Sequence, residues 1–206
     1  TPSSADPLYT YYHDNVWGQP RVFFDDGRDN QLFGHLCLEL MQCGLNFGII
    51  LKKEKSMKEA FDGFDIDTVA AYTPADVERL LKNEGIIRHR GKIQACIDNA
   101  RIAQRIIEVH GSFRKWVWRL GPVGDRERLV APGLAPASHM RTHQKSGMGN
   151  FDADGVHPTE TVAKATAVLK ALGMKFMGET TCLSWFQAIG LVNHHKLSCY
   201  AFEPCE

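Results

Sequence analysis

Apolar residues recur every three or four positions through most of this sequence, which is the spacing of helices that bury one face. The clearest stretch is 29–44, in which Asp29 is placed to cap the start of a helix and Gly44 to end it. The apolar positions on its buried face are Leu32, Leu36, Leu40 and Cys43. Because no segment alternates between apolar and polar residues as a half-buried strand does, the pattern predicts an all-α fold.

Two further helix starts are marked by their capping residues. Ser56 and Glu59 have the spacing of a capping box. Thr73 followed by Pro74 is typical of an N-cap and the first helical position. Helical periodicity is also present in residues 91–111, 159–173 and 180–190.

The length fits one large domain, residues 1–206, or two small lobes that share a core. The helical pattern of residues 29–120 is interrupted by a short basic turn at 85–92. Residues 121–158 are rich in Gly, Pro, Ser and His without periodicity, which predicts a long flexible loop.

Charge and composition narrow the functional classes. The 206 residues carry 24 basic and 24 acidic side chains, so binding to nucleic acid must depend on a local patch rather than on a global field. No apolar run approaches the roughly 18 residues of a membrane span, so we expect no membrane partner. Of the six cysteines, Cys37 and Cys96 fall near apolar helix faces. This placement favours reduced thiols in an intracellular protein, which we expect to be a monomer.

The segment "GIIRHRGKI", residues 85–93, is the best candidate for such a patch. Its short turn leads into the long helix, whose first amides and positive dipole end favour a phosphate. The residues expected to contact a phosphate, such as one of a nucleic acid backbone, are Gly85, Arg88, His89, Arg90, Gly91 and Lys92. The alternative is a solvated connection between two helices.

Glu39 is unusual because it falls on the same face as the apolar stripe of residues 29–44. A carboxylate pointed into a core is costly unless it meets a partner. The partner is either an internal Arg or a ligand. A dense aromatic group accompanies it, and it either packs as ordinary core or stacks on a flat, cationic ligand. The members of that group are Tyr9, Tyr11, Tyr12, Trp17 and Phe47.

Near the C-terminus, His195 and Cys199 lie four residues apart, which suits two metal ligands on one helical turn. Two ligands do not complete a site. His13, in "YYHDNVWG", would supply a third, and a zinc ion held by all three would join the two ends of the chain. A lone His is otherwise more often a hydrogen-bonded structural residue.

Four segments together resemble one family: "DPLYTYYHDNVWG", "LFGHLCLELMQCGL", "LLKNEGIIRHRGKIQACIDNAR" and "GLVNHHKLSC". They are similar to the 3-methyladenine DNA glycosylase I family of helix–hairpin–helix DNA glycosylases, over nearly the whole chain except residues 121–158. The resemblance implies a single glycosylase domain built as a bilobed helical bundle. One lobe would be residues 29–120 with a hairpin at 85–92 that grips the DNA backbone, and segments 1–28 and 159–206 would pack together. It also implies a base-excision repair enzyme that binds double-stranded alkylated DNA, rotates 3-methyladenine out of the stack and hydrolyses its N-glycosidic bond.

The resemblance also assigns roles to individual residues. Glu39 corresponds to the glutamate that binds the damaged base. The residues that correspond to the lining of the base pocket are Tyr9, Tyr12, Leu45 and Phe47. The ligands that correspond to a structural Zn²⁺ site are His13, His195 and Cys199.

Two departures from the family pattern bear on these roles. The fourth zinc ligand of the family, a Cys, would precede Thr1, and Cys205 is the alternative within this chain. Phe47 stands where the family has a pocket tryptophan, and Pro2 aligns with another, so the stacking surface is smaller. The competing hypotheses are a non-catalytic DNA-binding module and a glycosylase with an altered lesion preference. We expect a monofunctional hydrolase and assign no general base.

Overall fold

The structure is a computed structural model, which describes residues 6–19, 28–121 and 158–192. The described elements are, in chain order, α1 (Pro7–Asn15), α2 (Asp29–Gln42), α3 (Phe47–Ala60), the short 3-10 helix η2 (Asp62–Phe64), α4 (Ile66–Ala70), α5 (Pro74–Lys82), α6 (Arg90–His110), α7 (Phe113–Trp118), α8 (Pro158–Ala171) and α9 (Glu179–Ala188). All the regular structure in these ranges is helical, which confirms the all-α prediction for them. The predicted loop at 121–158, apart from its two end residues, lies outside the described residues.

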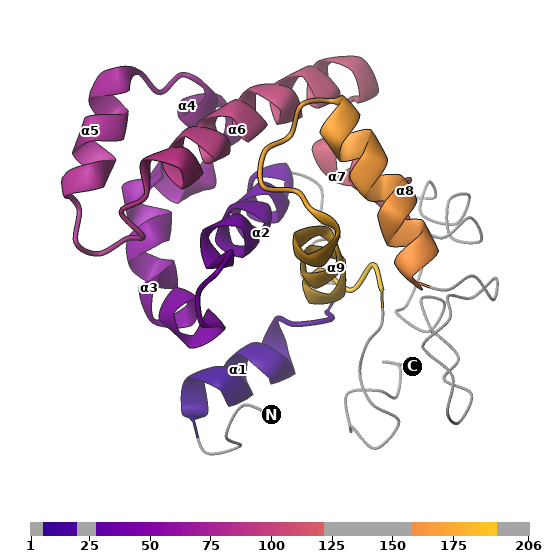
Figure 1. Cartoon of the computed structure of the whole chain (residues 1–206), viewed down its shortest axis with the longest axis horizontal. Coiled ribbons are helices and arrows are strands. Elements are labelled where there is room, and N and C mark those ends of the chain that lie inside the picture. The colour runs from indigo at the N-terminus through magenta and orange to yellow at the C-terminus, as the bar shows by residue number, and fades with distance from the viewer. Residues whose placement is uncertain (1–5, 20–27, 122–157, 193–206) are drawn as a thin grey trace.

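Helix α2 is the centre of the fold. It contacts α3, α4, α6, α7 and α9, and the other helices surround it (Figure 1). Residues 32–41 of α2 are all buried, including Leu32, Leu36 and Leu40 of the predicted stripe at 0% exposure. Cys43, its fourth predicted member, follows the end of the helix and is only partly buried. A polar residue within 32–41 is therefore held inside the protein by its neighbours, wherever it points around the helix.

The two ends of the described chain approach each other at α9. The amide of Gly18, just after α1, donates a hydrogen bond to the carbonyl of Ala188 at the end of α9 (2.9 Å). Helix α1 also packs against α3 (Figure 1). These contacts bring the aromatic residues of α1 next to the start of α3. The division into two lobes stays a prediction.

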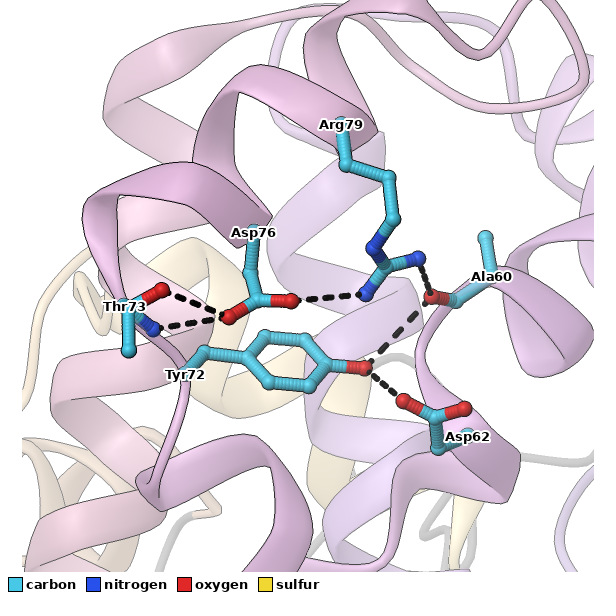
Figure 2. A network of polar contacts seen from close by, with 6 residues as sticks. All are labelled: Ala60, Asp62, Tyr72, Thr73, Asp76 and Arg79. Carbon is cyan, nitrogen blue, oxygen red and sulfur yellow. Dashed lines mark hydrogen bonds and ion pairs between the residues drawn. The ribbon is translucent and has the colours of Figure 1, made fainter.

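A polar network joins the end of α3 to the start of α5 (Figure 2). The carbonyl of Ala60 accepts hydrogen bonds from the Tyr72 hydroxyl (3.5 Å) and from the Arg79 guanidinium (3.1 Å), which also lies over the Tyr72 ring. Tyr72 donates to the Asp62 carboxylate, and Asp76 bonds both Arg79 and the cap residue of α5. The network therefore fixes α5, the helix that leads into the predicted hairpin, on the body of the protein.

Capping predictions had mixed outcomes. Thr73 caps α5 in a capping box with Asp76, and Gly44 follows the end of α2 with φ +76°, as predicted. The predicted helix start at Ser56 is wrong, because α3 begins nine residues earlier, capped by the side chain of Asn46. The predicted cap at Asp29 is also wrong. Its carboxylate instead accepts hydrogen bonds at the start of α7, from Ser112, Phe113 and Arg114.

None of the helices within the described residues is long and apolar enough to cross a membrane. Cys37 and Cys96 are fully buried and unbridged, as the apolar pattern predicted.

Candidate active site

Glu39 lies in α2 with 5% of its surface exposed, and it makes no ion pair or side-chain hydrogen bond with any residue that the structure describes. The internal salt bridge that the sequence left open is therefore not found in this part of the chain. Burial raises the pKa of Glu39 to about 7 from its usual 4.5. A buried carboxyl group with a raised pKa and no partner in the described protein is available to a charged or hydrogen-bonding ligand.

Tyr12, in α1, is the aromatic residue of this region with the most ring contacts. Its ring packs against Phe47 (centroids 5.0 Å apart, tilted by 58°) and lies nearly parallel to the ring of His35 (6.3 Å). Burial, and then the negative charges of Glu39 and Glu54, raises the pKa of Tyr12 well above its usual value. The contribution of the Glu39 charge indicates that the two side chains are near each other.

The Tyr12 hydroxyl is buried and has no hydrogen-bond partner among the residues that the structure describes. Buried polar atoms are nearly always paired, and an unpaired one needs a specific reason. A ligand that brings a hydrogen-bond donor or acceptor to the Tyr12 hydroxyl would supply that reason.

Tyr9 is fixed by the residues that start α3. Its hydroxyl donates to the Asn46 side chain (3.2 Å), and the same oxygen of Asn46 accepts the Gly48 amide (2.7 Å). A Cβ at Gly48 would lie 2.8 Å from the Tyr9 hydroxyl, so only glycine fits without displacing the ring. The cap of α3 and the predicted aromatic lining are thus one local structure.

The remaining predicted aromatic residues divide between two places. Trp17 stacks on His13 (6.0 Å), whereas Tyr11 is 63% exposed. Leu45, predicted to line the pocket, is 38% exposed in the connection between α2 and α3. Tyr9, Tyr12 and Phe47 therefore lie together where α1 meets the start of α3, and Leu45 is partly exposed nearby in sequence; with Glu39 they remain the predicted base pocket.

His35 is a further candidate residue, next to Tyr12, that the sequence did not single out. It lies one helical turn before Glu39 in α2, where the ring of Tyr12 covers it. Burial lowers the pKa of His35 to about 4, so the imidazole is neutral near pH 7. The signal was present in the sequence, because positions 35 and 39 share a helical face.

The predicted hairpin connects α5 to α6 through residues 83–89. Arg88 and Arg90 are exposed and pair with Glu84 (3.6 Å) and Glu78 (2.7 Å). His89 caps α6 by accepting the Lys92 amide, so Gly91 lies in the first turn of the helix. The exposed members of the predicted DNA-binding set therefore lie together around the start of α6.

Lys92 departs from the prediction. It is only 5% exposed, and its ammonium donates to the carbonyls of Met41 (2.8 Å) and Cys43 (2.6 Å) at the end of α2. Burial lowers its pKa. Because this ammonium is committed to α2, the predicted phosphate contact is corrected: Lys92 ties the helix after the hairpin to the helix that carries Glu39.

For the metal site, the structure describes one of the three predicted ligands. The Nδ1 atom of His13 lies 2.8 Å from the Asp14 carboxylate, an arrangement that orients many zinc-binding imidazoles. His195, Cys199 and Cys205 lie outside the described residues. Within the ranges that are described, no cluster of three or more potential ligands occurs.

Comparison with known proteins places this geometry in a family. Residues 2–202 match the model of the methyladenine glycosylase family. The DNA-3-methyladenine glycosylase 1 of Escherichia coli K12 is 37% identical over 97% of this chain and 94% of its own length. The corresponding enzyme of Haemophilus influenzae is 33% identical over 97% of this chain and 92% of its own.

Solved structures agree with the sequence matches. A crystal structure of 3-methyladenine DNA glycosylase I covers 97% of this chain and 97% of its own, at 39% identity and a TM-score of 0.77. The Staphylococcus aureus enzyme, solved to explain 3-methyladenine recognition, covers 96% of this chain and 92% of its own, at 32% identity and a TM-score of 0.75. The chain belongs to the methyladenine glycosylase family.

Proposed function

We propose that this chain removes 3-methyladenine from alkylated DNA by hydrolysing the bond between the base and its sugar. It is a DNA glycosylase by family, and its relatives are named for this base. The observation that carries the proposal is Glu39, which is buried without an ion partner among the described residues and shares its site with the unpaired Tyr12 hydroxyl.

Charge complementarity is the physical basis of selection. Methylation at N3 gives the base a fixed positive charge in DNA, and ionised Glu39 would complement that charge. Aromatic faces such as that of Tyr12 add a cation–π attraction of about 0.5–2 kcal/mol each. Undamaged adenine carries no such charge. The free-energy cost of ionising buried Glu39 is therefore offset only when the damaged base enters.

The chemical step needs little assistance because the base is already a good leaving group. The bond between C1′ and the base nitrogen breaks, and its electron pair leaves with the base, which becomes neutral. Water adds to C1′ and loses a proton to solvent. Lys92 donates to two backbone carbonyls and so is not placed as a Schiff-base nucleophile. These contacts of Lys92 support a monofunctional hydrolase, which is the activity that we propose.

The hairpin would hold the duplex beside the lesion while the base rotates out of the stack. Arg88 and Arg90 are exposed, and their carboxylate partners can be exchanged for phosphates at small cost, since such surface pairs contribute about 0–1 kcal/mol. The first amides of α6 would bind the same backbone.

A structural zinc ion remains part of the proposal. His13 would hold it through the nitrogen that does not face Asp14, together with His195 and Cys199 and either Cys205 or a Cys ahead of Thr1. Such an ion would join the ends of the chain and take no part in the reaction.

Phe47 favours one variation on this function, an altered lesion preference. It contacts Tyr12 inside the site at the position where the resemblance implies a tryptophan. A smaller ring leaves room for a base with a different alkyl group.

An excision assay tests the proposal. Methylated duplex DNA is incubated with the protein, and the released bases are separated by chromatography. We expect free 3-methyladenine with the wild type, little with Glu39→Gln, and wild-type release with the exposed control Glu108→Gln. Binding of methylated DNA without any released base would instead support the non-catalytic module.

A further inference from the structure

Phe176, in the connection between α8 and α9, is an aromatic residue in an unusual backbone conformation. It has φ +58°, a region that favours glycine, and 42% of its surface is exposed. Its neighbours Met174 and Met177 are almost completely buried, at 4% and 2%. The connection therefore places two methionines in the core and turns the phenylalanine ring outward between them.

This conformation is held in place by Asn99, a fully buried residue of α6. The Asn99 amide donates to the Lys175 carbonyl (3.1 Å), and its oxygen accepts the Lys175 amide (2.8 Å). The two bonds fasten the backbone beside Phe176 to α6, and the connection runs alongside that helix (Figure 1). Strained residues persist only where the surrounding structure fixes them, and they cluster at binding and active sites.

The ring lies next to the hairpin. Its Cζ atom is 4.0 Å from the position that a Cβ would take at Gly91, and the His89 ring is 3.2 Å from the same point. Lys175 is exposed as well. The surface around the start of α6 therefore includes an exposed aromatic ring and a cation from a segment more than eighty residues away in sequence.

We propose that Phe176 is a DNA-binding residue that packs against a sugar or base of the strand whose phosphates the hairpin holds. The inference rests on the proposed function. Aromatic rings beside basic groups are a common surface for nucleic acid, because every nucleotide presents an apolar face next to a phosphate. An outward ring fixed by Asn99 needs no reordering when the DNA arrives.

The test compares Phe176→Ala with Phe176→Trp. Affinity for a duplex that contains a non-hydrolysable abasic analogue is measured by fluorescence anisotropy, and affinity for free 3-methyladenine by intrinsic fluorescence. We expect Phe176→Ala to bind the duplex about tenfold more weakly, since a stacked ring contributes on the order of tenfold or more. Phe176→Trp should restore binding, and neither variant should change affinity for the free base.

Leu172→Ala is the matched control, because Leu172 is 40% exposed in the same connection. It should leave duplex affinity unchanged. Equal duplex affinities for the wild type and Phe176→Ala would overturn the role of Phe176 but not the proposed function. If Phe176→Ala lost affinity for the free base as well as for the duplex, Phe176 would have a structural role, and the inference would also fail. A wild-type protein that binds neither duplex nor base would overturn the proposed function itself.

Discussion

Replacing Glu39 by Gln removes a charge from the protein interior while keeping the side chain the same size. In the unfolded chain this carboxyl loses its proton near pH 4.5, and in the folded protein burial delays the loss until about pH 7. Between these pH values the folded state binds more protons than the unfolded state, so the free energy of unfolding falls as pH rises. The contribution is fully present below pH 4.5 and lost as pH rises through 7.

The size of the effect follows from the two pKa values. A difference of one pKa unit corresponds to about 1.4 kcal/mol, so a shift from 4.5 to about 7 amounts to roughly 3 kcal/mol above pH 7. Solvent screening reduces this little, because Glu39 is 5% exposed. Gln titrates at no pH, so Glu39→Gln should gain about 3 kcal/mol relative to wild type between pH 4.5 and 8.

Urea unfolding of both proteins across this pH range measures the difference. Glu108→Gln, at an exposed position of α6, controls for removal of a surface carboxylate. If the curves for wild type and Glu39→Gln ran parallel from pH 4.5 to 8, Glu39 would not be a buried charge in the free protein.

Three other substitutions probe the surroundings of the site. Lys92→Met removes both hydrogen bonds to the end of α2 and should lower the free energy of unfolding by about 2–4 kcal/mol in urea titrations. If this variant lost affinity for the duplex without losing stability, Lys92 would contact a phosphate after all. Gly48→Ala places a methyl group against the Tyr9 hydroxyl. It should weaken binding of free 3-methyladenine, measured by fluorescence, and lower the free energy of unfolding by about 1 kcal/mol. An unchanged affinity would show that Tyr9 does not line the site. Tyr12→Phe removes an unpaired buried hydroxyl, so thermal stability should stay equal or rise while base affinity falls; a marked destabilisation would mean that the hydroxyl has a partner in the free protein.

The sequence predicted those parts of the molecule that depend on near neighbours. The apolar face of α2, the cap at Thr73 and the turn at Gly44 are local patterns, and the structure confirms each. Glu39 could be singled out for the same reason, because its position on the buried face follows from counting along one helix.

The errors arose where a local pattern competes with a distant partner. Asp29 has the sequence context of a cap for its own helix, but its carboxylate caps α7, more than eighty residues later. Lys92 lies in a basic segment and was expected at the surface, yet α2 supplies two carbonyls that draw it inward. Ser56 and Glu59 match a capping box inside a helix that Asn46 had already started. Partners of this kind are set by the tertiary fold and leave no local trace.

The most direct test of the account is the pH dependence of 3-methyladenine excision. The positive charge of the damaged base is fixed by methylation, so the titration of Glu39 should control its capture. We expect kcat/KM of the wild type to rise with pH through an apparent pKa of about 7 and then level off, and Glu39→Gln to be slow with no such rise. A wild-type profile that is flat from pH 5.5 to 8, or a Glu39→Gln enzyme as active as wild type, would contradict the central role of this acid.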